Sequence, residues 1–157
     1  MNTQRIVGAI ALLLLAIPTN LHATNLHVTC SNASLRGTYG YFSQGFIPIT
    51  ADISPALFVP QAQTGLITFD RKGLVTSGTF TINTTDPAGG AARGTFTGTY
   101  LVNPDCAGTA ETMLPDNGGA FHYDLVVLSP IEFVAISSDN GGSLIYTAKK
   151  IRIPQEH

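Results

Sequence analysis

The chain has few of the residues that form most catalytic and nucleic-acid-binding sites. Its 157 residues include no tryptophan, charged residues make up 11%, and 8 lysines and arginines stand against 10 aspartates and glutamates. The formal net charge of −2 argues against a nucleic-acid partner, which requires a positively charged surface. Lys149, Lys150 and Arg152 form the one basic group, and such a group is also the ordinary solvated end of a strand.

Long apolar runs are equally scarce, and the clearest one lies at the N-terminus. Arg5 precedes an unbroken apolar run from Ile6 to Ile17, Pro18 ends it, and Ala23 offers a small residue for cleavage. These are the three parts of a secretory signal peptide. A run of about 12 apolar residues is shorter than the roughly 20 that a bilayer-spanning helix needs. We therefore expect a signal peptide at residues 1–23, a secreted or periplasmic mature chain, and no membrane span.

Cysteine is limited to two residues, Cys30 and Cys106. In an exported chain such a pair normally oxidises. The alternative is a metal pair or a reactive thiol, but neither cysteine has a histidine or a second cysteine at ligand spacing. The sequence therefore predicts a disulfide that pins the N-terminal segment to the turn holding Cys106, and it indicates no metal site and no cofactor.

The mature sequence alternates short β-rich runs with turn clusters and shows no helical periodicity, which is typical of a sandwich or a barrel. The links are short, and this favours antiparallel pairing because parallel neighbours need long crossovers. A closed barrel leaves no bare edges. We therefore predict that residues 24–157 form one all-β domain, an antiparallel eight-stranded up-and-down barrel, with a β-sandwich as the alternative. The expected strands are residues 35–46, 63–69, 74–83, 93–102, 109–114, 120–128, 132–138 and 143–151.

Alternation along the strands predicts which side chains face the interior. In residues 93–102, Thr95, Thr97 and Thr99 alternate with Phe96 and Tyr100. We expect the threonines to face water and the aromatic residues to face the centre. Residues 47–62 combine three prolines with apolar residues, which predicts a long apolar loop that covers one end of the barrel as a lid or packs on its wall.

Two stretches resemble a large group of uncharacterised exported bacterial proteins. They are GLITFDRKGLV at residues 65–75, followed by SGT at 77–79, and GTFTGTYLVNPDCAGT at residues 94–109. The resemblance spans most of residues 35–150 and implies a small barrel similar to the lipocalin and allene-oxide-cyclase type. The matching residues are turn and bend residues, which specify fold. No catalytic residue of a cyclase falls on a matching position.

We predict no catalytic residue, and four residues are weak candidates. His122 and Asp124 are two apart on one expected strand and so share a face, Glu132 begins the next strand, and Tyr146 lies on the strand after. In an apolar lumen a His–carboxylate pair would have the shifted acidities of a general acid/base site. However, Phe121 to Val127 form a more apolar face on the same strand, which predicts that His122 and Asp124 face water.

The first functional hypothesis is an exported, non-catalytic barrel that binds a small apolar ligand. Barrels of about eight strands either hold one small ligand or are filled by side chains. A small isomerase or cyclase with a site in the lumen is one alternative. A protein–protein interaction module, acting through the threonine-rich wall or the loops, is another. The sequence identifies no partner protein.

Overall fold

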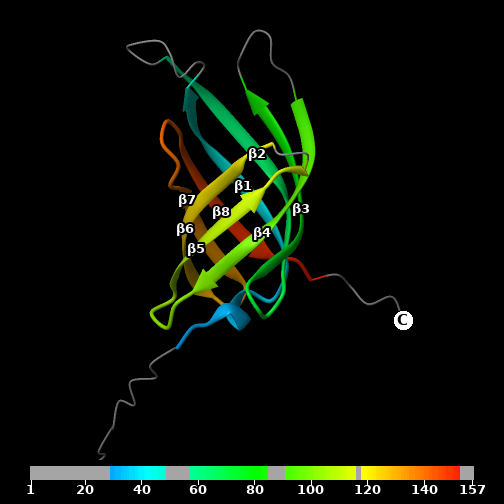
Figure 1. Ribbon diagram of the computed structural model, residues 1–157, viewed down its shortest axis with the longest axis vertical. Coiled ribbons are helices and arrows are strands. Elements are labelled where there is room, and N and C mark those ends of the chain that lie inside the picture. The colour runs from blue at the N-terminus through cyan, green and yellow to red at the C-terminus, as the bar shows by residue number, and fades with distance from the viewer. Residues whose placement is uncertain (1–28, 49–56, 85–90, 116–117, 153–157) are drawn as a thin grey trace, which may run out of the picture.

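In the computed structural model, residues 29–48, 57–84, 91–115 and 118–152 are described, and their eight strands form one closed antiparallel barrel (Figure 1). Each strand pairs with its neighbours in sequence, and the last strand closes onto the first. The predicted up-and-down barrel is confirmed, and the sandwich alternative is wrong. The predicted signal peptide lies outside the described residues. The strands are β1 (Gly37–Pro48), β2 (Phe58–Phe69), β3 (Leu74–Thr84), β4 (Ala91–Val102), β5 (Ala107–Met113), β6 (Ala120–Ser129), β7 (Glu132–Ser137) and β8 (Ser143–Lys150).

The predicted first strand begins too early, because Leu35 ends a short 3-10 helix, η1 (Asn32–Leu35). Two local hydrogen bonds stabilise this turn: the Ser34 N–H donates to the Ser31 carbonyl oxygen at 2.8 Å, and the Ser31 N–H donates to Ser34 Oγ at 3.1 Å. Gly37, with φ of +113°, then redirects the chain into β1. Leu35 is fully buried, so its apolar character reflects packing in the barrel and not a strand.

The prediction of a long loop at residues 47–62 is wrong at both of its ends. Ile47 pairs with Val59 and Pro48 pairs with Phe58, so both flanks extend the β1–β2 hairpin. Pro60 pairs with Phe46 of β1, and the β2–β3 ladder of the described residues begins one residue later, at Gln61. A proline fits such a position at the end of a ladder, where fewer backbone donors are needed. Residues 49–56 lie outside the described part, so the lid remains a prediction.

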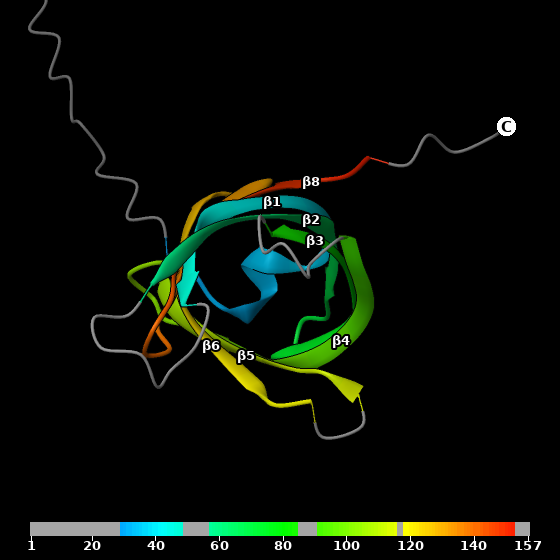
Figure 2. The same cartoon turned by 90° about the horizontal axis from the view of Figure 1, so that it is seen from above.

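The disulfide between Cys30 and Cys106 is present, with 4.9 Å between the two Cα atoms. It ties the segment before η1 to the β4–β5 turn, as predicted. The Cys30 N–H adds a hydrogen bond of 3.2 Å to the Pro104 carbonyl oxygen in the same turn. Viewed along the barrel, the blue segment that contains η1 lies within the ring of strands (Figure 2). We call this the closed end of the barrel, and the opposite end the far end.

Hydrogen bonds join η1 to the neighbouring strands and turns at the closed end. The Asn32 side-chain oxygen accepts the Val102 N–H at 2.7 Å. The Tyr100 hydroxyl lies 2.8 Å from the Asn32 carbonyl oxygen and 2.5 Å from the Asp70 carbonyl oxygen. Asp70 Oδ1 in turn accepts the backbone N–H groups of residues 72, 73 and 74 at 2.7–2.9 Å. This arrangement matches the predicted hairpin turn at residues 70–73 and braces the closed end.

Aromatic side chains fill the barrel above η1. Phe69 lies at their centre, and its ring centroid is 4.9 Å from that of Tyr100, 5.5 Å from Phe133 and 5.7 Å from Tyr39. All three pairs meet edge to face, the arrangement that aromatic quadrupoles prefer. These four residues form what we call the aromatic floor.

The outer wall has two kinds of surface. On β4, Thr95, Thr97 and Thr99 are exposed, as the alternation predicts. On β1 and β8, however, large apolar side chains face outward: Phe42 is 50% exposed and Ile145 is 57% exposed. Exposed apolar side chains also occur on other strands, among them Leu66, Leu101 and Leu128. The expectation that the solvent face carries hydroxyl-bearing side chains therefore holds only in part.

Candidate functional site

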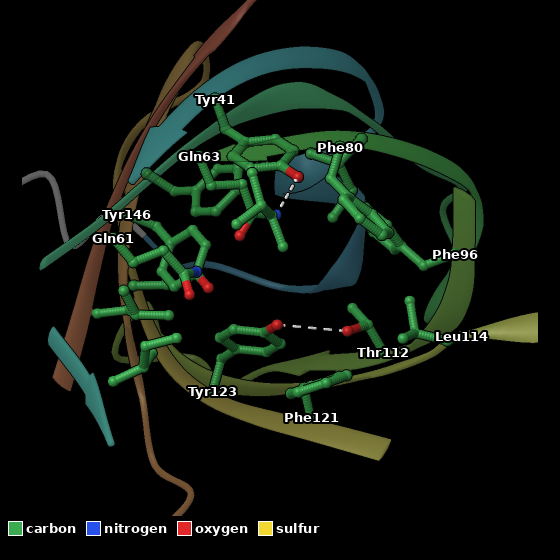
Figure 3. A pocket seen from close by; sticks show the side chains of 16 residues that line it. Tyr41, Gln61, Gln63, Phe80, Phe96, Thr112, Leu114, Phe121, Tyr123 and Tyr146 are labelled. Carbon is green, nitrogen blue, oxygen red and sulfur yellow. Dashed lines mark hydrogen bonds between the residues drawn. The ribbon is translucent and has the colours of Figure 1, made fainter. Parts of the chain in front are cut away.

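A cavity of about 340 Å³ occupies the barrel between the aromatic floor and the far end (Figure 3). It reaches from Phe133 and Ile67 near the floor to Ile47 and Leu114 near the far end of β1 and β5. Its volume is at the small end of the roughly 300–1,000 Å³ range of small-molecule sites. The lumen of this barrel is therefore not filled by the side chains of the described residues.

The cavity lining is apolar and uncharged. Ten of the 16 lining residues are apolar, and their side chains alternate inward from seven strands and the end of β5. The six polar ones carry hydroxyl or amide groups, and none of the 16 is Asp, Glu, Lys, Arg or His. The polar lining residues are Tyr41, Gln61, Gln63, Thr112, Tyr123 and Tyr146.

Tyr41 and Gln63 form a hydrogen-bonded pair on neighbouring strands. The Gln63 Nε2 group donates to the Tyr41 hydroxyl at 2.7 Å (Figure 3). This hydroxyl donates to the Thr79 carbonyl oxygen at 3.1 Å. Gly65 makes the approach possible, because a Cβ there would lie 1.9 Å from the Thr79 oxygen and 2.9 Å from the Tyr41 hydroxyl. Burial raises the pKa of Tyr41 well above its usual range, against the opposing effect of the Gln63 hydrogen bond.

Tyr123 and Tyr146 form a second aromatic group in the cavity. Their ring centroids are 5.2 Å apart with planes at 88°, and the Tyr146 centroid lies 6.1 Å from that of Tyr41. The Tyr123 hydroxyl lies 3.4 Å from Thr112 Oγ1 (Figure 3). Burial, ahead of the neighbouring tyrosines, raises the pKa of Tyr146, and burial also raises the pKa of Tyr123. Both hydroxyls are therefore protonated at neutral pH and able to donate hydrogen bonds.

Two polar side chains of the barrel interior make no side-chain hydrogen bond of ordinary geometry to a described residue, and of these two the Ser43 Oγ is the one fully shielded from solvent. The Gln61 side chain lines the cavity, is 8% exposed, and makes no hydrogen bond to any described residue. Ser43 is fully buried next to Tyr146 across the β1–β8 pair, and its Oγ has no hydrogen-bond partner of ordinary geometry within the described residues. A fully buried polar atom without a partner, such as the Ser43 Oγ, lowers the stability of the fold by about 1–3 kcal/mol.

The structure does not bring the four candidate residues together. Tyr146 lies in the cavity, whereas His122 and Asp124 are exposed on the outer wall. His122 contacts Asp139, with 2.7 Å from Nδ1 to Oδ1 and 2.8 Å from its backbone N–H to Oδ2. Glu132 is at the opposite end of the β6–β7 hairpin, 3.8 Å from the Lys149 Nζ.

The sequence reasoning missed Tyr41, Gln61 and Gln63. Counting back in steps of two from the buried Phe69 puts both glutamines on the inward face of β2. They were missed because Gln61 was assigned to a loop and Gln63 to a strand start, so the alternation was not followed far enough.

The described residues include no group of three or more His, Cys, Asp or Glu side chains that could hold a metal ion. No helix among them is long and apolar enough to cross a membrane.

No protein-family model matches the chain, and no curated protein matches it. Solved structures with similar shapes include a redesigned β-barrel, with 14% identity over 77% of this chain and 95% of that chain and a TM-score of 0.46. Another is the S-type phycobiliprotein lyase from Guillardia theta, with 9% identity over 78% of this chain and 92% of that chain and a TM-score of 0.38. Identities and TM-scores this low give no indication of function. The resemblance to uncharacterised exported bacterial proteins thus stays a prediction.

Proposed function

We propose that the protein is an exported barrel that binds one small, mainly apolar molecule in its lumen. The observation that carries this proposal is the cavity of about 340 Å³ with its ten apolar and six uncharged polar lining residues. Apolar walls with a few polar groups are what small-molecule sites share.

The energetics of the cavity support binding. A ligand that buries roughly 200 Å² of apolar surface gains about 5 kcal/mol at 25 cal/mol per Å², before the costs of association. The disulfide and the braced closed end support a preformed lumen, which reduces the ordering cost of binding. Export is supported by the pattern of residues 1–23 and by the disulfide, because disulfides persist in oxidising compartments.

An isomerase or cyclase is the weaker alternative. Tyr123 and Tyr146 could donate hydrogen bonds to a developing oxyanion. The described lining residues include no carboxylate or imidazole that could accept a proton, and His122 and Asp124 lie on the other side of the wall. Binding therefore has more support than proton-transfer catalysis.

The test compares a blocked lumen with a matched change on the outer wall. Ala135 lines the cavity, so Ala135→Phe places a ring inside it, whereas Ala62 is exposed and Ala62→Phe adds the same ring outside. We expect the wild-type protein to increase the fluorescence of Nile red, a neutral apolar probe. Ala135→Phe should abolish this increase and Ala62→Phe should retain it. A wild-type protein that does not bind the probe, or equal losses in the two variants, would contradict the proposal.

Native mass spectrometry complements this test. A compound that co-purifies with the wild-type protein and is absent from Ala135→Phe would identify the ligand class directly. The mass of the exported chain also tests cleavage after Ala23.

A further inference from the structure

We infer that the lumen selects neutral ligands that carry one hydroxyl or carbonyl group, and that the Gln61 side chain is the group that binds this polar end. This inference rests on the proposed function and specifies the chemistry of the ligand. It starts from a buried amide that lines the cavity and has no partner among the described residues.

Gln61 differs from the other polar lining residues in this respect. The Gln63 amide and the Tyr41 hydroxyl satisfy each other at 2.7 Å. The Tyr123 hydroxyl lies 3.4 Å from Thr112 Oγ1, and the Tyr123 ring packs against that of Tyr146. The Gln61 amide has no hydrogen bond to a described residue and faces the cavity, so both its N–H and its C=O groups are available to a ligand.

The position of Gln61 fits an anchor for one end of an elongated ligand. Its neighbours across the β1–β2–β3 ladders are Gly45 and Thr84, near the far ends of the strands, whereas Phe133 and Ile67 line the cavity close to the floor. Gly45 has no side chain, so β1 places no side chain opposite Gln61 at this register position. Figure 3 shows the Gln61 amide directed into the cavity, on the same side as Tyr146. A ligand with its polar group at Gln61 would therefore extend its apolar part toward the floor.

The lining also disfavours an ionised ligand. Moving a carboxylate or an ammonium group out of water costs several kcal/mol unless an opposite charge compensates, and the 16 lining residues include no ionised side chain of either sign. The tyrosine hydroxyls of the lining are neutral, because burial raises the pKa of Tyr41, Tyr123 and Tyr146. An amide both donates and accepts hydrogen bonds, so alcohols and ketones suit it equally well.

The experiment uses competitors of equal chain length against bound Nile red. At about pH 8, where carboxylates and ammonium groups are both ionised, decanol and 2-decanone should displace the probe at concentrations roughly a hundredfold lower than decanoate and decylammonium, as a cost of several kcal/mol requires. Decanoate should gain in affinity as the pH falls through the pKa of its own carboxyl group.

Variants at Gln61 test the anchor itself. Gln61→Leu should keep Nile red bound but weaken decanol and 2-decanone by roughly tenfold, the worth of one hydrogen bond. Gln44→Leu makes the same change on the exposed face of β1 and should have no effect. Gln61→Glu keeps the size and should shift the preference from decanol toward decylammonium, which tests the anchor independently if Gln61→Leu does not fold.

The outcomes separate this inference from the proposed function. Decanoate that competes as well as decanol at about pH 8, or Gln61 variants that bind the series like the wild type, would overturn the inference and leave lumen binding intact. Failure of the wild-type protein to bind Nile red or any member of the series would instead overturn the proposed function.

Discussion

Replacing both cysteines, Cys30→Ser with Cys106→Ser, should lower the stability of the barrel by about 4 kcal/mol. The disulfide joins residues 76 positions apart. In the chain-entropy treatment, a closed loop of about this length removes roughly 15 cal/mol/K from the unfolded chain, or between 4 and 5 kcal/mol at 25 °C. For a domain of this size each kcal/mol shifts Tm by about 3–5 °C, so we expect Tm to fall by roughly 12–20 °C.

Urea unfolding followed by circular dichroism measures the effect. The wild-type protein in reductant should match the double variant, and reductant should not change the double variant further. The m-value should rise slightly when the bond is absent, because the unfolded chain then exposes more surface. A double variant within about 1 kcal/mol of the oxidised wild type, with equal m-values, would refute the reasoning that the bond restricts the unfolded chain.

Three further predictions concern other contacts. Gly65→Ala should cost at least about 1–3 kcal/mol, because its Cβ would lie 1.9 Å from a carbonyl oxygen of β3, whereas Gly142→Ala, with its nearest atom at 3.6 Å, should leave the urea midpoint unchanged. Tyr100→Phe should cost about 1–2 kcal/mol, because the single hydroxyl proton shared between the Asn32 and Asp70 carbonyl oxygens is lost; an unchanged midpoint would contradict this. The hydrogen bond to Asp139 raises the pKa of His122, and the His122 backbone N–H lowers the pKa of Asp139. This contact should therefore contribute most between about pH 4 and 6.5, and its contribution should fall as the pH rises through the His122 pKa or drops through the Asp139 pKa. Asp139→Asn should return the His122 pKa toward its ordinary value in an NMR titration, and an unchanged pKa would contradict the assignment.

The strand order was predictable from the sequence because its turns are marked by residues with strong local preferences. Asp70 and Gly73 bracket the β2–β3 turn: the Asp70 carboxylate accepts three backbone N–H groups, and Gly73 adopts φ of +110°. Because such short links cannot span the crossover between parallel strands, neighbouring strands must pair antiparallel. The inward face of β4 could also be predicted from the sequence, because Phe96 and Tyr100 alternate with threonines.

The parts that were not predictable depend on contacts between distant segments. Leu35 is apolar whether it lies in a strand or in η1, and its burial inside the barrel decides between the two. Pro60 suggests a loop by its local preference, but its pairing with Phe46 of β1, one residue before the described β2–β3 ladder begins, places it in β2. Gln61 was not predicted to line the lumen for the same reason: its inward direction follows from the pairing of β2 with β1, which the local sequence did not indicate.

If the lumen binds a ligand as proposed, the two ends of the barrel should have different roles in stability and binding. A lumen with a cavity forgoes packing contacts that a filled core would make, so the fold depends on the closed end for much of its stability. There the disulfide, the Asn32 hydrogen bonds and the aromatic floor combine contacts from both halves of the chain. Changes at the closed end should therefore lower Tm, with ligand binding lost as a consequence of unfolding. Ala135→Phe instead fills empty space and should leave Tm unchanged or raise it while binding is lost. This separation of stability from binding is expected if the cavity is a binding site, and it would be absent if the cavity were a packing defect in an ordinary core.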